Sequence, residues 1–350
     1  MPASSDVLIR VEGRVGHITL ARPQALNAVT HQIVDAMLAA LAAWENDGDI
    51  GLVLVDAEGD KAFSAGGDLS WIYRCGKTGD IMSANRFWRD EYRLVALIAR
   101  YSKPFVAIMD GIVMGGGVGL SAHGSHRIVT ETSMIAMPEC SVGLITDVGG
   151  TWLLANAPGQ AGAYLGLTGT RMSGADAIHA GFADLFVPRA RLGELKAALV
   201  AAGDVSVLET FAVEPPSSGL ARDRGQIDRL FAGDTVATII DALARDGSDW
   251  ARKARGAIGR GSPISEILTL AAIRNAPSLG AALIREYRFV SRALEHGDFL
   301  EGIRAIVIDK DRAPVWRFTD IASVPADLVA LLQREADGGD PDFNTVRDMS

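Results

Sequence analysis

Two glycine-rich stretches decide the fold, FSAGGDL at residues 63–69 and MGGGVGL at residues 114–120. Each comes after a short apolar run typical of a buried strand, LVLV at 52–55 and FVAIM at 105–109. The second stretch opens what we expect to be a helix that ends near His123. Because strand, glycine loop and helix occur twice in tandem, the pair is more informative than either loop alone.

The flanking sequence extends the alternation of strands and helices. Apolar spacing predicts helices where hydrophobic residues recur every three or four positions, and strands where β-rich runs are bounded by turn residues. Alternation of short buried strands with helices indicates an α/β architecture. We expect a hairpin of residues 7–11 and 15–20, helices over 29–44 and 88–100, and strands over 127–130 and 134–137.

The second half of the chain has a different character. Strand signals fade, and EPPSSG at 214–219 is typical of a break or linker. The sequence beyond it indicates helices up to about Ala305, and the polar tail 335–350 is expected to be frayed. We therefore expect a catalytic core over 1–205 and a mainly helical region over 206–350.

Composition excludes several classes of protein. The 350 residues are 48% hydrophobic and 22% charged, which fits a globular chain with a sizeable core. A net charge of −9 disfavours nucleic-acid binding. Two cysteines, an N-terminus unlike a secretory signal and no long apolar run predict a cytoplasmic protein that does not insert in membranes.

Backbone amides are the first candidate chemical groups. A glycine cluster at a helix start, Gly115–Gly117, presents unpaired N–H groups and the positive end of the helix dipole. This arrangement suits a phosphate or a developing oxyanion, although tight packing of helix against strand explains a single cluster equally well. The spacing does not match a dinucleotide-binding fingerprint.

Two carboxylates follow the glycine loops. Glu139 comes after Pro138 at a strand end, and Asp147 lies before Val148-Gly149-Gly150. Each could be a turn residue or a helix cap. Together they could supply a general base and an orienting or proton-donating partner.

Other reactive side chains have simpler interpretations. His123 and His126 lack a nearby carboxylate or cysteine set, so we interpret them as packing or surface residues and expect no metal. Cys140 has no assignable histidine partner, and a small buried neighbour of Glu139 is the simpler interpretation.

The paired glycine loops, together with ARPQALNA at 21–28, resemble the crotonase (enoyl-CoA hydratase/isomerase) superfamily. The resemblance implies a spiral of β-β-α units, as in the ClpP/crotonase fold, with a C-terminal helical region. It also implies that the amides of Gly67 and Gly116 form an oxyanion hole for a thioester carbonyl. The same resemblance implies substrate contacts from Ala25, Ala65 and Asp68.

Within that superfamily, the acidic residues of the site determine which reaction is catalysed. A typical hydratase has one glutamate at the position of Gly119 and a second at the position of Glu139, so the first is missing here. The sequence from Met137 to Gly150 instead resembles the 3-hydroxyisobutyryl-CoA hydrolase branch, as do FWRDEY at 87–92 and DFLEGIRA at 298–305.

That resemblance implies hydrolysis of a small acyl-CoA thioester in valine degradation, with no cofactor beyond the coenzyme A of the substrate. Glu139 would activate water or attack the carbonyl itself, and Asp147 and Glu91 would contact the substrate or position the nucleophile. Two alternatives stay open, an enoyl-CoA hydratase or isomerase and a non-catalytic acyl-CoA-binding protein. Related proteins assemble as trimers or hexamers, so a homo-oligomer is an expectation too.

Overall fold

The computed structural model describes residues 6–343, which fold as two compact units. The first unit takes in the chain up to Gly67, Arg93–Ala136 and Arg171–Ala221. The second unit takes in Asp68–Tyr92, Met137–Thr170 and the chain from Arg222 onward. The two units interleave along the sequence and do not follow the single division near residue 205 that the sequence suggested.

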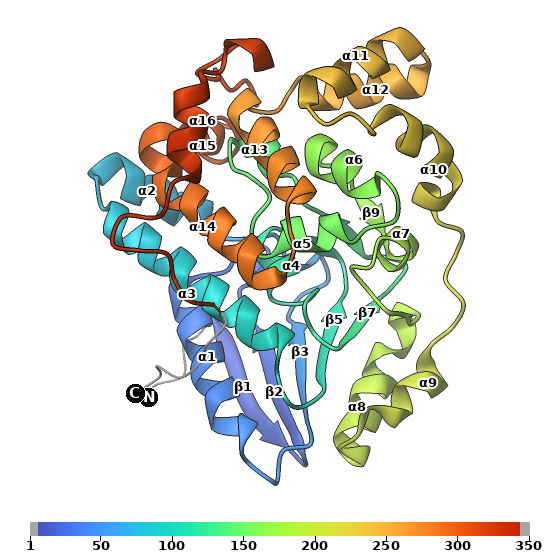
Figure 1. Cartoon of the computed structure of the whole chain (residues 1–350). Helices are drawn as coiled ribbons and strands as arrows, with labels where there is room; N and C mark the ends of the chain where they lie inside the picture. The colour runs from blue at the N-terminus through green and yellow to red at the C-terminus, as the bar shows by residue number, and fades with distance from the viewer. Residues whose placement is uncertain (1–5, 344–350) are drawn as a thin grey trace. The chain divides into compact units, whose positions relative to one another are not determined.

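A six-stranded sheet lies at the centre of the first unit. Its order is β1-β2-β3-β5-β7-β10, and β1 pairs antiparallel with β2 while every other pair is parallel. The expected hairpin and buried strands are confirmed, and Figure 1 shows β1, β2, β3, β5 and β7 beside one another. The strands are Val7–Glu12, Val15–Leu20, Leu52–Ala57, Phe105–Met109, His126–Val129 and Leu185–Phe186.

A second, four-stranded sheet positions the glycine loops. Its order is β4-β6-β8-β9, with β4, β6 and β8 parallel and β9 antiparallel to β8. Because β4 and β6 are parallel neighbours, the loops that follow them leave the sheet at the same edge. The strands are Ala62–Ser64, Ile112–Met114, Met134–Ala136 and Met172–Ser173. Strand β6 differs from the sequence analysis, which places Met114 in the second glycine loop and no strand at 112–114.

Helix α1 confirms the predicted helical period. It spans His31–Glu45, begins after the Thr30 cap, and buries Ile33, Met37, Leu41 and Trp44. Trp44 packs directly on β2, since a Cβ at Gly16 would lie 2.5 Å from the indole ring. The other helices of this unit are η1 Pro23–Ala25, α4 Gly116–Gly119, α7 Gly174–His179, η3 Arg189–Arg191, α8 Leu192–Ala202, η4 Val205–Val207 and α9 Leu208–Phe211. Helix α4 ends before the expected His123.

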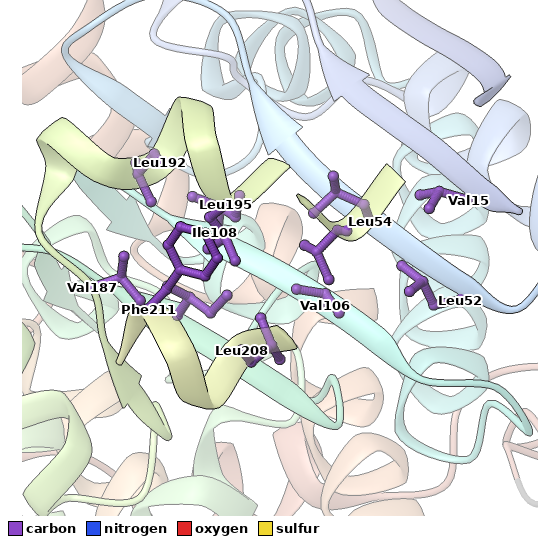
Figure 2. Packing of buried hydrophobic residues seen from close by; sticks show 12 residues of the cluster. Val15, Leu52, Leu54, Val106, Ile108, Val187, Leu192, Leu195, Leu208 and Phe211 are labelled. Atoms are coloured by element: carbon purple, nitrogen blue, oxygen red, sulfur yellow. The ribbon is translucent and has the colours of Figure 1, made fainter. Parts of the chain in front are cut away.

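Helices α8 and α9 cover one face of the six-stranded sheet (Figure 2). Leu195 and Leu199 of α8 and Phe211 of α9 pack on sheet residues such as Leu54 and Ile108. Burial of an aliphatic side chain of this size stabilises the fold by about 1.5–3 kcal/mol. This core holds the sheet rigid beneath the strand ends.

The second unit is helical among the residues described. Helix α3 (Ile81–Ala99) begins in this unit and ends in the first, and it starts seven residues before the predicted Trp88. Helices α11 and α12 lie side by side in Figure 1. The further helices are α2 Leu69–Thr78, η2 Glu139–Val142, α5 Gly150–Ala155, α6 Ala161–Thr168, α10 Gly219–Leu230, α11 Val236–Asp246, α12 Asp249–Ile258, α13 Pro263–Arg274, α14 Leu279–His296, α15 Phe299–Ile303, η5 Arg304–Ile308, η6 Ile321–Ser323 and α16 Ala326–Gln333.

The C-terminal segment corrects one expectation. Residues 335–343 contain no helix or strand, yet they are not frayed. Phe343 is buried against the rings of Tyr92 and Tyr287, with centroids 6.0 and 6.4 Å away. Asp340 accepts a 3.0 Å hydrogen bond from Arg288 Nε. Aromatic packing and this ion pair anchor the segment, whereas the rest of the predicted tail, 344–350, lies outside the described residues.

Of the helices in residues 6–343, none combines the length and the apolar character that crossing a membrane requires.

Candidate active site

The two glycine turns of the first unit pack main chain against main chain. Gly66 has φ +106° and Gly115 has φ +49°, in the region that favours glycine. A Cβ at Gly66 would lie 3.2 Å from the Met114 carbonyl oxygen and 3.6 Å from the Gly116 nitrogen. A Cβ at Gly117 would lie only 2.5 Å from the Ser64 carbonyl oxygen. The main chains of the two glycine turns therefore lie in close contact.

Two amides in these turns have no internal acceptor. Among residues 6–343, no main-chain oxygen accepts a hydrogen bond from the N–H of Gly67 or of Gly116. Gly116 is the first residue of α4, where helix geometry leaves N–H groups unpaired. Free amides in neighbouring turns can stabilise negative charge on a carbonyl oxygen.

Asn27 fixes the segment that carries Ala25. Asn27 is buried with φ +54°, and its side-chain amide donates to the carbonyl oxygens of Glu58 and Ala62 at 2.9 and 2.8 Å. Ala65 N–H donates to the Leu26 carbonyl at 3.0 Å, so the structure brings the Ala25 segment beside Ala65. The sequence analysis quoted Asn27 without giving it a role, although asparagine tolerates positive φ and bonds to backbone readily.

Asp68 has a visible structural task. It is the N-cap of α2, and its Oδ1 accepts a 3.1 Å hydrogen bond from Trp71 N–H. Capping of this kind contributes about 0.5–2 kcal/mol to stability. The expected substrate contact of Asp68 stays a prediction.

The three predicted acids, Glu91, Glu139 and Asp147, are all buried in the second unit. Glu91 lies on α3, Glu139 begins the short helix η2, and Asp147 precedes α5. The negative charge of Asp147 raises the pKa of both Glu91 and Glu139, so the three carboxyl groups lie within electrostatic range of one another. Glu91 Oε1 and Glu139 Oε2 have no hydrogen-bond partner within residues 6–343. Such buried, unpartnered carboxyl oxygens are costly for the fold and typical of a functional site.

Glu139 sits on a firmly held support. Helix η2 begins after Pro138 and ends at Gly143, which has φ +76°. A Cβ at Gly143 would lie 2.6 Å from the Asp298 carbonyl oxygen, and one at Gly302 would lie 2.0 Å from the Val142 carbonyl oxygen. Main-chain packing at these two glycines leaves η2 little freedom to move, which fixes the direction of the Glu139 side chain.

Burial and mutual repulsion set the protonation of these acids. Burial, then the charges of Asp147 and Glu286, raises the pKa of Glu139 well above its ordinary value. Burial and the charge of Asp147 do the same to the pKa of Glu91. Burial also raises the pKa of Asp147, but the hydrogen bond from Tyr92 opposes that rise. Acid–base chemistry near neutral pH needs neighbouring carboxyl groups whose pKa values differ from one another.

Two residues at this site were missed by the sequence analysis. Tyr92 donates a 2.8 Å hydrogen bond from its hydroxyl to Oδ2 of Asp147. Glu286 of α14 accepts a 2.7 Å hydrogen bond from Gly149 N–H, two residues after Asp147. Tyr92 directly follows Glu91 in the sequence, which is the only local signal for it, and nothing near Glu286 marks it.

Cys140 behaves as a buried neighbour. Its Sγ lies 3.4 Å from Thr269 Oγ1, and burial raises the pKa of the thiol far above its ordinary value. A nucleophilic cysteine needs the opposite shift. His126, at the start of β7, pairs through Nδ1 with Ser125 Oγ at 2.9 Å.

The fold and these turns define a member of the crotonase class. The family model for enoyl-CoA hydratase/isomerase matches residues 15–332, and the chain belongs to that family. Among solved structures, one titled an enoyl-CoA hydratase from Rhodobacter sphaeroides 2.4.1 is 48% identical, with a TM-score of 0.89 over 94% of this chain and 97% of that chain. One titled a carnitinyl-CoA dehydratase from Mycobacterium thermoresistibile is 45% identical, with a TM-score of 0.92 over 97% and 98%. The predicted crotonase fold is confirmed.

Curated relatives carry a different name. The chain is similar to 3-hydroxyisobutyryl-CoA hydrolase, mitochondrial, of Gallus gallus, with 38% identity over 93% of this chain and 88% of that protein. The protein of the same name in Homo sapiens is 38% identical over 92% of this chain and 86% of that protein. Because these relatives are named as mitochondrial, the cytoplasmic location expected from the sequence is wrong. A low cysteine count indicates a reducing environment, but it does not distinguish among the compartments that keep thiols reduced.

Proposed function

We propose that this protein hydrolyses 3-hydroxyisobutyryl-CoA to 3-hydroxyisobutyrate and free coenzyme A, a step of valine degradation. The curated relatives with this name match nearly the whole chain and support the proposal. The structural observation that carries it is the buried group of Glu91, Glu139 and Asp147 in a chain whose residue 119 is glycine. A hydratase works with a pair of glutamates, and this chain has glycine at the position of the first one.

The proposed mechanism divides the work between amides and acids. The N–H groups of Gly67 and Gly116 polarise the thioester carbonyl and stabilise the oxyanion that forms when the carbonyl carbon is attacked. Glu139, in its ionised form, either takes a proton from the attacking water or attacks the carbon itself to give an anhydride that water opens. The sulfur of coenzyme A leaves with the bonding electrons and is protonated.

Asp147 and Glu91 position the reactants in this proposal. Asp147, fixed by Tyr92, orients the nucleophile or the substrate hydroxyl, and Glu91 contacts the substrate. Ala25, Ala65 and Asp68 contact the coenzyme A part of the substrate. Water and the thioester are the only reactants, so the proposal includes no resident cofactor or metal. Assembly into trimers or hexamers stays part of the proposal, as in related proteins.

One alternative has its own support. The Rhodobacter sphaeroides structure, at 48% identity, is titled an enoyl-CoA hydratase. Hydration uses two glutamates, whereas a single glutamate suffices for the proton shuttling of isomerisation. The absence of the first glutamate therefore disfavours enoyl-CoA hydration more than enoyl-CoA isomerisation. A non-catalytic acyl-CoA-binding role is the remaining alternative, and intact acids at 91, 139 and 147 disfavour it.

A pair of assays separates these functions. Released thiol is measured with 3-hydroxyisobutyryl-CoA, and the absorbance of the conjugated double bond is followed with crotonyl-CoA. Hydrolysis predicts steady thiol release from the first substrate and no absorbance change with the second. Loss of crotonyl-CoA absorbance without thiol release would establish the hydratase alternative instead.

A further inference from the structure

We propose that Glu286 is a positioning residue that holds the Asp147–Thr151 turn, and through it the Asp147 carboxylate, in the geometry for reaction. The inference rests on the proposed function, because it assigns a task in that same site. Glu286 lies on α14, 139 positions after Asp147, and is fully buried in the second unit.

The Glu286 carboxylate binds the start of helix α5 from outside that helix. Its Oε2 accepts from Gly149 N–H at 2.7 Å, and its Oε1 accepts from Thr151 N–H at 3.1 Å. Oε1 also accepts a short hydrogen bond from the Thr151 hydroxyl. Both oxygens are thus used on N–H groups that a helix start leaves unpaired. No residue within α5 or before it supplies a side-chain cap.

The turn needs such an outside support because its backbone is strained. Val148 has φ +53° and Gly149 has φ +75°, two left-handed residues in succession. A β-branched residue in this region is strained and persists only where its surroundings enforce it. Gly150 N–H closes the turn on the Asp147 carbonyl at 2.7 Å. Release of Gly149 and Thr151 would therefore let the main chain of Asp147 relax.

Tyr92 supports the same acid from its side chain. Its hydroxyl fixes Asp147 Oδ2, while Glu286 fixes the main chain on the other side of the residue. Asp147 is thus held at two points that belong to α3 and α14. Catalysis requires that such a side chain is held in a defined geometry, and support at two points provides that.

Burial of an acidic side chain such as Glu286 costs more free energy than a helix cap alone requires. Within residues 6–343 it makes no ion pair with lysine, arginine or histidine side chains, although Arg285 next to it interacts with its charge. The titratable groups that face it are the carboxyl groups of Asp147 and Glu139 and the neutral hydroxyl of Tyr92. Burial raises the pKa of Glu286 to about 8, with Asp147 adding to the rise. An amide side chain would avoid this cost, but it offers one acceptor oxygen where the turn uses two.

The experiment compares Glu286→Gln with Glu266→Gln in the full-length protein. Glutamine keeps the size of the side chain and one acceptor oxygen, but it places an NH₂ group against one of the two turn amides. Glu266 is the matched control because it is a buried glutamate of the same unit that does not bind the Asp147–Thr151 turn. Thr151→Val removes the hydroxyl bond alone.

Two readouts are taken, kcat and KM for thiol release, and hydrogen–deuterium exchange of a peptide covering 147–155. We expect Glu286→Gln to lower kcat at least tenfold with KM within threefold, and to speed exchange at that peptide. Thr151→Val gives smaller changes in the same direction, and Glu266→Gln leaves kcat and the exchange unchanged.

Unchanged exchange at the turn in Glu286→Gln would overturn the inference, as would an unchanged kcat. Exchange is read without substrate, so it tests the hold on the turn even if the wild-type protein releases no thiol. That last result would instead overturn the proposed function.

Discussion

The hydroxyl of Tyr92 donates a 2.8 Å hydrogen bond to Oδ2 of Asp147, and both residues are buried. The donor stabilises the ionised form of Asp147, so it offsets part of the rise in pKa that burial causes. This bond joins α3 to the turn before α5 inside the second unit. The hydroxyl of Tyr92 therefore contributes to both the position and the ionisation of Asp147.

Tyr92→Phe removes that donor and little else. We expect the pKa of Asp147 to rise, so the acid limb of kcat/KM moves to higher pH. Loss of a hydrogen bond to a charged group costs about 1.5–3 kcal/mol, which predicts roughly a tenfold or greater fall in kcat. Tyr287→Phe is the control, because Tyr287 is a buried tyrosine of the same unit whose hydroxyl contacts Arg89 rather than Asp147. An unmoved acid limb in Tyr92→Phe would contradict the assignment.

Gly117→Ala tests the packing of the glycine turns. The added Cβ would meet the Ser64 carbonyl at 2.5 Å, so the two turns must move apart. Overpacking of this kind costs about 1–3 kcal/mol, and the displaced amides should lower kcat more than they raise KM. Thermal unfolding and thiol release measure the two effects.

Gly193→Ala is the matched control in the same unit. A Cβ at Gly193, on helix α8, would meet no atom within 4 Å. Alanine is the better helix former, so stability should rise by about 0.5–1 kcal/mol with activity unchanged. Equal stability losses in the two variants would refute the claim that Gly117 is held by close packing.

Glu266→Gln tests the cost of a buried acid away from the site. Glu266 is 2% exposed, its Oε1 has no partner within the described chain, and burial raises its pKa to about 9. Its ordinary value is 4.5, so the folded state binds the proton more tightly than the unfolded state does. Stability is therefore lost as pH rises from about 4.5 toward 9.

Glutamine carries no titrating group, so the variant should escape that loss. We expect the free energy of unfolding in urea to exceed that of the wild type by more than about 1 kcal/mol at pH 8, and to differ little at pH 5. The comparison isolates Glu266 because the other buried acids are present in both proteins. A variant no more stable at pH 8 than the wild type would show that Glu266 ionises freely in the folded state.

Local pattern predicted most of the fold. The hairpin of β1 and β2, helix α1 and strand β5 follow from alternation or helical period within a few residues, which a sequence displays directly. Strand β6 has only three residues beside a glycine loop, so its pairing with β4 and β8 defines it rather than its own sequence. The interleaving of the two units depends on contacts between distant segments and left no local signal.

The candidate site also combines residues that short motifs reveal with residues that only contacts between distant segments bring into place. The glycine loops and the acids at 91, 139 and 147 are recognisable from short motifs, and the structure places the three acids together. Tyr92 reaches Asp147 across 55 positions, and Glu286 reaches Gly149 across 137. No motif encodes such pairs, since only the packing of α3 and α14 brings them into contact with the turn.

The most direct test of the account is Glu139→Gln, measured by thiol release from 3-hydroxyisobutyryl-CoA beside the wild type. Glutamine keeps the shape of the side chain but can neither take a proton from water nor attack the carbonyl. We predict that kcat falls by at least about 10²–10⁴-fold while circular dichroism and the unfolding midpoint show an intact fold. A folded variant that releases thiol at the wild-type rate would contradict the central claim that the carboxylate at residue 139 drives the reaction.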